Sequence, residues 1–524
     1  MLPLLTAAQM RACDEYTIHQ KGIPSQVLME RAARAAIEVL RSEPDLNMTD
    51  RTHVVLLCGS GNNGGDGFAM ARFLFEDGVD AIVCYAGEWQ RDVPNEQKMS
   101  IECARQYRLW RDCGGKTIHI LPRFRPKRTL VVDALFGIGL CREIEGIAAQ
   151  WIQEVSFHGC PVLAIDIPSG VQADSGRVQA CALHATVTAT IGEVKRGLLL
   201  YPAAQYVGKL RVCDIGVDAQ CLLDIPDAQP WGGWYMTGVE DVSDLLYRPP
   251  YAHKGTFGRV VVIGGSSGMS GAPYFAAKSA YRAGAGLVEI FTDEANRIPL
   301  QTLIPEAVLT LFSPDALPSD EQWLHLFNRA DSVVLGCGLG QSDAALHIVE
   351  ATLRQCKKPL ILDADALNLI AAHKPLQALM TARNTPTVIT PHMGEAARLS
   401  GRTIAELAED PFAASASLAK QYHAVCVLKD ARTVISNGKL YWIQSHGNSG
   451  MATGGSGDCL AGVIGCLYAK TRSWESTPGF IAAAGVLIHA IAGDLAAQRL
   501  GESAVMASDI ANAIGDALKK VLKR

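Results

Sequence analysis

The sequence predicts an α/β protein of two domains, each with a parallel sheet covered by helices. Three observations lead to this prediction. Short apolar runs alternate with helical patterns, glycine-rich loops follow several of these runs, and the same order begins again after residue 254. Between Cys221 and Lys254 the periodicity is lost and four prolines gather near Trp231 and Trp234. We interpret that segment as a linker or a docking segment and expect domains at residues 1–222 and 223–524.

The first domain opens with a helical pattern over residues 6–40. An apolar run, a glycine loop and a second helical stretch to residue 75 follow, which is the order of a doubly wound sheet. The carboxyl ends of parallel strands share one rim of such a sheet, so the loops after them are expected to converge. The expected strands are residues 53–58, 81–85, 129–133, 162–166 and 185–190.

The second domain repeats this organisation. Its expected strands are residues 259–263, 287–291, 332–335, 360–362, 387–389 and 425–428. The uncharged stretch at residues 480–493 stops at Asp494, short of the ~20 apolar residues that a membrane span needs. No transmembrane segment is therefore expected.

Composition restricts the class of protein. The chain has 524 residues, of which 48% are hydrophobic and 19% charged, and a net charge of −5 argues against a general nucleic-acid or membrane-surface binder. The apolar run at the N-terminus is too short for a secretory signal. Fifteen cysteines without a Cys-x-x-Cys motif are typical of reduced, buried thiols, so we expect a cytoplasmic protein without metal ligation through sulfur.

Three loops of the first domain each follow an expected strand. Gly59–Gly67 offers glycines for close approach to phosphate, together with two asparagines and an aspartate. The other loops begin at Asp133 and Asp166. Side-chain oxygens of Asn63, Asp133 and Ser169 could bind a cation, although a lone Asp or Asn after a strand is also a common helix N-cap.

The segment Asn448–Asp458 places glycines and small residues ahead of one carboxylate, at the start of an apolar helical run. Glycines let backbone N–H groups face an anion, and a helix N-terminus adds partial positive charge. Asp458 could then act as the base for a hydroxyl that is being phosphorylated. The plainer interpretation is a glycine-rich turn capped by an aspartate. Four further motifs accompany this segment, at residues 264–273, 336–340, 363–368 and 390–395.

The loop Gly59–Gly67, with Asp133, residues 166–170 and Lys195, resembles the NAD(P)H-hydrate epimerases over about residues 1–220. The resemblance implies a Rossmann-like three-layer domain that interconverts the R and S epimers of hydrated NAD(P)H, NAD(P)HX. It implies Asp166 as the acid/base and Asn63, Asp133 and Ser169 as ligands of a potassium ion. The implied substrate residues are Asn62, Asn63, Gly64, Gly65, Asp66, Gly137, Ile138, Gly139, Leu140, Cys141, Arg142, Glu143 and Asp166.

The second half, about residues 235–524, looks like the ADP-dependent NAD(P)H-hydrate dehydratases, which have a ribokinase-like α/β fold. The resemblance implies that Asp458 activates the substrate hydroxyl toward the terminal phosphate of ADP, which enters with magnesium. NAD(P)H, AMP and phosphate are the implied products. The implied substrate residues are Ala276, Gly340, His392 and Asp458. The implied ADP-binding residues are Lys429, Asp430, Ala431, Arg432, Thr433, Ser449, Gly450, Met451, Ala452, Thr453, Gly454, Gly455, Ser456 and Gly457.

Some of these residues also have simpler interpretations. His392 could be a turn residue, and Lys429 and Arg432 could be solvated surface cations. Asp430 and Met393 depart from the family pattern, which has a small glycine and often a proline there.

Two other functions remain open from the sequence. The second domain could be a ribokinase-type kinase of a small alcohol, and the first could be a Rossmann-like module that binds without catalysis. The expected partners are the small molecules NADHX, NADPHX and ADP, with no nucleic acid and no membrane, and we expect a homo-oligomer.

Overall fold

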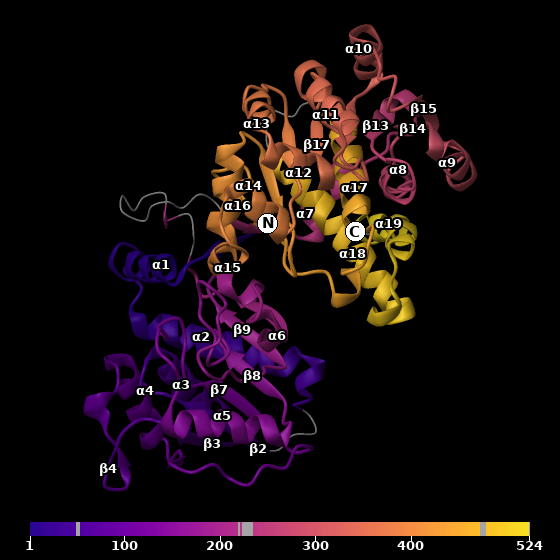
Figure 1. Ribbon diagram of the computed structural model, residues 1–524. Coiled ribbons are helices and arrows are strands. Elements are labelled where there is room, and N and C mark those ends of the chain that lie inside the picture. Colours follow the sequence, from indigo (N-terminus) through magenta and orange to yellow (C-terminus); the bar gives the residue numbers. More distant parts are fainter. Residues whose placement is uncertain (49–52, 218–220, 223–233, 472–477, 523–524) are drawn as a thin grey trace. The chain divides into compact units, whose positions relative to one another are not determined.

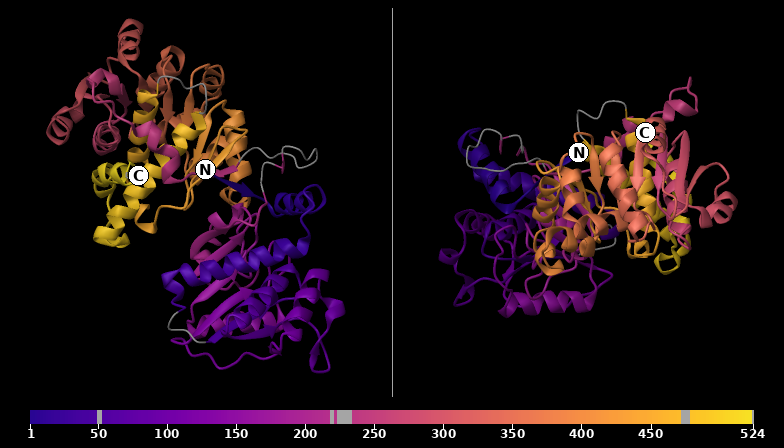
Figure 2. Two further views of the ribbon diagram at one scale, coloured as in Figure 1. Left: turned by 180° about the vertical axis from the view of Figure 1, so that it is seen from behind. Right: turned by 45° about the horizontal axis from the view of Figure 1, so that its top comes forward.

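The computed structural model describes residues 1–48, 53–217, 221–222, 234–471 and 478–522. The chain forms two compact units, Leu2–Trp231 and Gly232–Arg524 (Figures 1 and 2). Each unit is an α/β structure with its own sheet and its own cores. The predicted α/β class with parallel sheets is therefore confirmed.

The main sheet of the first unit has seven parallel strands in the order β11-β9-β8-β7-β2-β3-β6. From β2 the chain moves outward to β3 and β6, then returns to β7 on the other side of β2. The loops after β2 and β7 therefore diverge, which opens a crevice at the rim. These strands are β2 (His53–Cys58), β3 (Asp80–Tyr85), β6 (Thr117–Ile118), β7 (Thr129–Ala134), β8 (Val162–Ile165), β9 (Val187–Ile191) and β11 (Lys209–Cys213).

Alternation along β2 explains the two cores of this unit. Val54 and Leu56 pack under α2, α3 and α4, whereas Val55 and Leu57 pack under α5. Short strands lie outside this sheet: β1 (Leu2–Leu5) pairs with β10 (Val194–Lys195), and β4 (Trp89–Gln90) pairs with β5 (Val93–Pro94). The helices are α1 (Ala7–His19), α2 (Ser25–Ser42), α3 (Asn62–Glu76), α4 (Ile101–Asp112), α5 (Gly146–His158) and α6 (Ala204–Val207).

Within the second unit the strand order is β12-β21-β20-β19-β18-β17-β16-β13-β14-β15. The pairs from β15 to β19 are parallel, and β20 runs antiparallel to both of its neighbours. Here the strand order reverses between β13 and β16. The strands are β12 (Trp234–Met236), β13 (Arg259–Ile263), β14 (Leu287–Asp293), β15 (Val308–Phe312), β16 (Ser332–Leu335), β17 (Leu360–Leu362), β18 (Thr387–Ile389), β19 (Val425–Leu428), β20 (Val434–Ser436) and β21 (Tyr441–Ile443).

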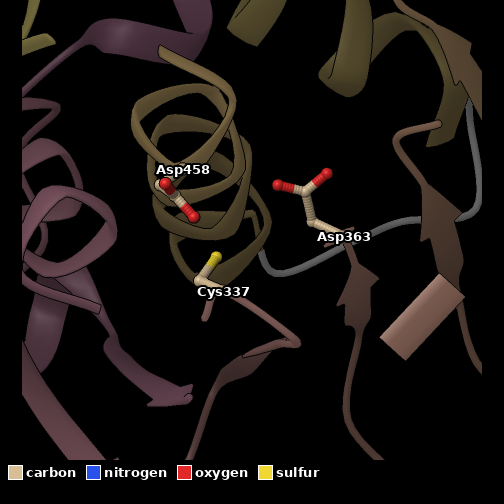
Figure 3. A group of neighbouring side chains, drawn as sticks. All are labelled: Cys337, Asp363 and Asp458. Atoms are coloured by element: carbon tan, nitrogen blue, oxygen red, sulfur yellow. The ribbon is translucent and has the colours of Figure 1, made fainter. Parts of the chain in front are cut away.

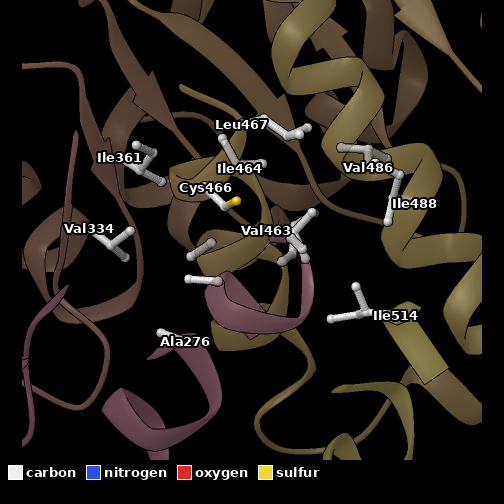
Figure 4. Close-up of a cluster of buried hydrophobic side chains, with 14 of the residues drawn as sticks. Ala276, Val334, Ile361, Val463, Ile464, Cys466, Leu467, Val486, Ile488 and Ile514 are labelled. Carbon is white, nitrogen blue, oxygen red and sulfur yellow. The ribbon is translucent and has the colours of Figure 1, made fainter. Parts of the chain in front are cut away.

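Helices cover both faces of this sheet (Figure 1). The core drawn in Figure 4 joins strands to α8, α17, α18 and α19, and Val463, Ile464 and Ile514 are among its members. The helices are α7 (Val239–Val242), α8 (Gly271–Arg282), α9 (Arg297–Leu303), α10 (Asp320–Arg329), α11 (Asp343–Gln355), α12 (Ala364–Ala372), α13 (Lys374–Thr381), α14 (Met393–Ser400), α15 (Ile404–Glu409), α16 (Pro411–Gln421), α17 (Ser456–Lys470), α18 (Pro478–Leu500) and α19 (Ala507–Leu522).

Helix α18 extends past Asp494, at which the uncharged stretch of the sequence stops. Its 23 residues are long and apolar enough to cross a membrane by length and composition alone, with a mean hydropathy of 1.8. However, 78% of the apolar window is buried within the protein, as in the core helix of a globular domain. Asp494 lies within this helix, and its carboxylate accepts hydrogen bonds from the neighbouring loop.

Two expectations need correction. The helical stretch over residues 6–40 is two helices, because Gly22 has a φ of +68° and Pro24 caps α2. For the second part of the segment interpreted as a linker or a docking segment, the linker alternative is wrong: β12 pairs in parallel with β21, and α7 follows it. Residues 223–233, the rest of that segment, lie outside the described residues.

Candidate functional sites

The first unit contains a cavity of about 570 Å³. It lies at the crevice between β2 and β7, where the strand order reverses, and residues after both strands line it. Ten of the residues expected to bind substrate line this cavity: Asn62, Asn63, Asp66, Gly137, Ile138, Gly139, Leu140, Cys141, Arg142 and Asp166.

Three expected residues, Gly64, Gly65 and Glu143, lie outside the lining. Gly64 instead permits close packing, because a Cβ atom there would lie 1.9 Å from the carbonyl oxygen of Gly59. A Cβ atom on Gly65 would lie 2.8 Å from the methyl group of Met29, which does line the cavity. These glycines set the path of α3 rather than facing the open space.

Asp166 is held in an unusual conformation at the cavity wall. Its φ is +70°, and Oδ1 accepts hydrogen bonds from Lys195 Nζ and from the backbone N–H of Ile191. Lys195 is only 1% exposed and also donates to Thr190 Oγ1, at 3.2 Å. Backbone strain of this kind persists where the surroundings fix it, often at functional sites. The arrangement places one carboxylate oxygen against a buried ammonium.

Two more aspartates line the same cavity. Asp66 is half-buried, and burial, reinforced by the charges of Asp166 and Asp14, raises the pKa of Asp66 well above its ordinary value. Burial also raises the pKa of Asp14, on α1, to about 6. The cavity thus combines four carboxyl groups, those of Asp14, Asp66, Glu102 and Asp166, with the ammonium of Lys195, a set suited to proton exchange.

Of the three expected cation ligands, Asn63 lines this cavity, whereas Asp133 and Ser169 lie outside its lining and are hydrogen-bonded to each other. Ser169 donates to Asp133 from both its hydroxyl, at 2.6 Å, and its backbone N–H, at 2.7 Å. The side-chain oxygen and nitrogen of Asn63 are buried and have no hydrogen-bond partner within the described part of the chain. A Cβ atom on Gly137 would lie 3.2 Å from Asn63 Cβ and 3.4 Å from Asp166 Oδ2. An unsatisfied buried amide beside a buried carboxylate fits a bound cation with oxygen ligands.

In the second unit, three side chains converge where the strand order reverses (Figure 3). Cys337 follows β16, Asp363 follows β17, and Asp458 lies in the first turn of α17. One sulfur or oxygen atom from each lies within 4.8 Å of the others. Burial first, and then the charge of Asp363, raises the pKa of Asp458 to about 6.

Lys429 already supplies a positive charge to this group. Its Nζ donates to Asp363 Oδ1 at 2.7 Å, and Thr390 Oγ1 donates to the same oxygen at 2.7 Å. A Cβ atom on Gly457 would lie 3.2 Å from Lys429 Nζ, so the N-terminus of α17 reaches this ammonium. The set of Cys337, Asp363 and Asp458 is poorly suited to magnesium, because a thiol is a soft ligand and Lys429 occupies Asp363.

The other expected substrate residues of this unit differ in position. Gly340 donates its backbone N–H to Asp365 Oδ2 at 2.8 Å. The next residue, Gln341, lines a second cavity of about 510 Å³. His392 caps α14 and its side chain is 55% exposed. Ala276, by contrast, is fully buried in the core of Figure 4, where its carbonyl oxygen would lie 2.0 Å from a Cβ atom on Gly462.

The two segments expected to bind ADP are joined by one network. Arg432 donates to the carbonyl oxygen of His446 at 2.8 Å. Asp494, on α18, accepts hydrogen bonds from His446 Nδ1, the Gly447 backbone and Asn448 Nδ2, at 3.0 to 3.2 Å. Burial tends to raise the pKa of Asp494, but these donors outweigh it and lower the pKa.

The glycine loop ends in the turn that starts α17. Gly455 has a φ of +93° and caps the helix, and no atom lies within 4 Å of a Cβ atom built on Gly454. Open space therefore lies beside Gly454 at a helix N-terminus, where a phosphate can approach the backbone. Elsewhere in the expected ADP segments, Ser449 Oγ donates to Glu502, and the backbone of Ala431 donates to Asp430.

Comparison with known proteins settles the family. A bifunctional NAD(P)H-hydrate repair enzyme of Moorella thermoacetica is 35% identical to this chain, over 97% of this chain and 95% of the relative. One from Escherichia coli is 36% identical, over 93% of this chain and 88% of the relative. The chain belongs to the bifunctional NAD(P)H-hydrate repair enzymes.

The two halves of this repair enzyme match two family models. The YjeF-related protein N-terminus model matches residues 25–197, within the first unit. The NAD(P)H-hydrate dehydratase model matches residues 260–515, within the second. A solved ADP/ATP-dependent NAD(P)H-hydrate dehydratase from Bacillus subtilis, co-crystallised with ATP/Mg²⁺, is 26% identical, covers 54% of this chain and 97% of its own, and gives a TM-score of 0.47.

The sequence did not single out every polar residue of these sites. Asp14 and Thr390 were not predicted as site residues, and neither was Asp494. For Asp14 a signal exists, because Met10, Asp14 and Ile18 recur every four residues and all three line the cavity. For Asp494 the apolar environment in the sequence hides its polar role.

The Asp494 network gives a specific prediction for the repair enzyme. We expect Asp494→Asn to raise KM for ADP about tenfold, with kcat little changed, since one misplaced donor in a part-buried network costs about 1–3 kcal/mol. Steady-state dehydratase kinetics measure this change, with Asp516→Asn on the exposed part of α19 as the control. An unchanged KM for ADP would show that the network does not support the loop.

Proposed function

We propose that the protein repairs hydrated nicotinamide cofactors in two steps. The first unit interconverts R- and S-NAD(P)HX, and the second converts S-NAD(P)HX to NAD(P)H at the expense of ADP, giving AMP and phosphate. The placement of Asp458 carries this proposal: a carboxyl group with a pKa of about 6 lies beside Lys429 and the glycine-rich start of α17. Family membership over nearly the full chain supports it.

In the second unit, Asp458 takes the proton of the substrate hydroxyl as that oxygen attacks the terminal phosphorus of ADP. Lys429 and the amides around Gly454–Gly457 stabilise the negative charge on the transferring phosphoryl group. The ring nitrogen then donates its electron pair, phosphate leaves, and loss of a proton restores the ring of NAD(P)H. Phosphate leaves far more readily than hydroxide, which is why the nucleotide is consumed.

The remaining residues of the second site have supporting roles in this proposal. His392 and Gly340 contact the substrate, and the segments 429–433 and 449–457 hold the nucleotide. Asp363 and Asp365 brace the loops, since their oxygens already accept hydrogen bonds from Lys429 and Gly340. Magnesium enters with ADP and is held mainly by its phosphates, because the surrounding thiol and ammonium do not favour a metal site made by the protein alone.

In the first unit, Asp166 exchanges a proton with the hydrated ring, and the loops at residues 62–66 and 137–143 hold the dinucleotide. Asn63, Asp133 and Ser169 would hold potassium, a choice supported by the unsatisfied amide of Asn63. The ion would supply positive charge near the substrate phosphates. We further propose that the protein acts in the cytoplasm and that it is a homo-oligomer. Light scattering of the purified protein would test the oligomeric state.

A single assay tests the proposed function. The purified protein is given a mixture of both NADHX epimers with ADP, with ATP or without nucleotide, and absorbance of reduced nicotinamide is followed. Rapid and complete recovery that requires nucleotide is expected. If only the S epimer is converted, the epimerase activity proposed for the first unit is refuted. No recovery, together with a stable phosphorylated product from a small alcohol, would favour a ribokinase-type kinase instead.

A further inference from the structure

Helix α1 contributes one wall of the cavity in the first unit. Met10, Asp14 and Ile18 lie four residues apart, so they share one face of the helix, and all three line the cavity. Asp14 is the polar member of this otherwise apolar stripe. It comes from a different part of the chain than Asp166, which follows β8, yet the two carboxyl groups border the same space and their charges interact.

The surroundings of the two carboxyl groups differ. Asp166 accepts a hydrogen bond from the buried ammonium of Lys195 and another from the backbone of Ile191. No hydrogen bond to the Asp14 carboxyl is found among the described residues, although the side chain is half-buried. A carboxyl group placed in an apolar wall without a compensating hydrogen bond costs free energy of folding. Such a cost is typical of a group that has its partner in a ligand.

We propose that Asp14 is a second catalytic residue of the epimerase site and shuttles a proton in concert with Asp166. This inference rests on the epimerase activity proposed above. Inversion of the hydroxylated carbon needs a proton donor for the hydroxyl that leaves and a proton acceptor for the water that returns to the opposite face. Two carboxyl groups on separate elements supply both.

Water leaves from one face of the ring and returns to the other, with one proton transferred each time. Protonated Asp14 gives its proton to the substrate hydroxyl, the C–O bond breaks, and water leaves as the ring nitrogen forms a double bond to that carbon. A water molecule adds from the other face and gives its proton to the carboxylate of Asp166. One proton is donated by Asp14 and one is accepted by Asp166, and no electrons are lost. Exchange with solvent returns the proton from Asp166 to Asp14 before the next turnover in the same direction. The reverse reaction runs with the two groups exchanged.

The charges around Asp14 favour this role. Burial has the largest effect and raises its pKa to about 6, the charges of Asp166 and Glu15 raise it further, and Lys195 opposes them. Asp66, from α3, also faces this group, and Arg11 lines the cavity from α1 itself. A carboxyl group that titrates near pH 6 holds and releases a proton more readily near neutral pH than an ordinary aspartate.

The test measures interconversion of purified R-NADHX into S-NADHX by chromatography, without nucleotide, so that the second unit is idle. We expect Asp14→Asn to slow interconversion at least about 100-fold, the lower end of the contribution of a general acid. Glu38→Gln, an exposed change on α2 away from the cavity lining, is the control and should keep the wild-type rate. Run in H₂¹⁸O, the wild-type reaction should place one ¹⁸O in each inverted molecule.

A positioning role for Asp14 would give a different pattern. Because Asp14 must be protonated to donate, the wild-type rate of conversion of R-NADHX should fall as pH rises through about 6. This fall should be absent from the pH profile of the residual activity of Asp14→Asn. A fall near pH 6 that persists in Asp14→Asn would overturn the proposal. Asp14→Glu keeps a carboxyl group at this position and should therefore retain part of the rate, even if Asp14→Asn is slow because it destabilises the fold. Wild-type rates in Asp14→Asn, or inversion without ¹⁸O, would refute the inference alone, whereas a wild-type protein that fails to interconvert the epimers would refute the proposed epimerase as well.

Discussion

The Asp458→Asn variant is expected to lose about 10²- to 10⁴-fold of its dehydratase rate while it retains epimerase activity. The amide cannot accept the hydroxyl proton as phosphoryl transfer begins, and a general base contributes about this much. The measurement is kcat for NADPH formation from S-NADPHX and ADP, followed by absorbance. Because burial disfavours the ionised form of Asp458, its removal should not lower the unfolding temperature at neutral pH.

The pH dependence of the wild-type dehydratase supplies an independent check. Asp458 must be ionised to act as a base, and its pKa is raised to about 6. The rate should therefore fall as pH decreases through about 6, rather than near 4 as for an ordinary aspartate. A dehydratase rate that is flat down to pH 5, or an active Asp458→Asn protein, would remove Asp458 from the base role.

The Asp166→Asn variant is expected to lose epimerase activity and part of the stability of the first unit. The buried ammonium of Lys195 would lose its carboxylate, and breaking a buried ion pair from one side costs about 3–5 kcal/mol. Interconversion of R- and S-NADHX measures the activity, and thermal unfolding measures the stability. The dehydratase rate should remain, because it depends on the other unit.

A double variant separates these two effects. Asp166→Asn combined with Lys195→Met removes both charges, so the fold should regain stability. The epimerase should nevertheless stay inactive, because no carboxyl group remains at that position. Recovery of epimerase activity in the double variant would mean that Asp166 acts only through the fold.

Much of the fold follows from local patterns in the sequence. Nine of the eleven expected strands match observed strands to within one residue at both ends, and β14 ends two residues later than expected. The fifth strand of the first domain begins at Val187 rather than 185. Apolar runs and glycine loops are local signals, so they locate the strand ends from which both sites are built. The same signals predicted Asp166, Asp458 and the loop at residues 59–67.

Features that depend on distant packing were not predictable in this way. The short strand β12 forms because it pairs with β21, some two hundred residues later. Asp14 belongs to a site because α1 folds over the crevice between β2 and β7, and Asp494 because α18 lies beside the loop at residues 446–448. Lys429 was expected on nucleotide, whereas its hydrogen bond to Asp363 is a pairing that only the fold brings about.

The central claim is that one chain carries two separate sites that together repair both epimers. Complementation between the Asp166→Asn and Asp458→Asn proteins tests it most directly, with a mixture of both NADHX epimers and excess ADP. Asp458→Asn alone should recover almost no reduced nicotinamide, and Asp166→Asn alone should stop once the S epimer is consumed. Mixed, the two should recover all of it, because S-NADHX made by one protein is free to reach the other. If the final recovery of reduced nicotinamide in the mixture is no higher than with Asp166→Asn alone, the account is contradicted.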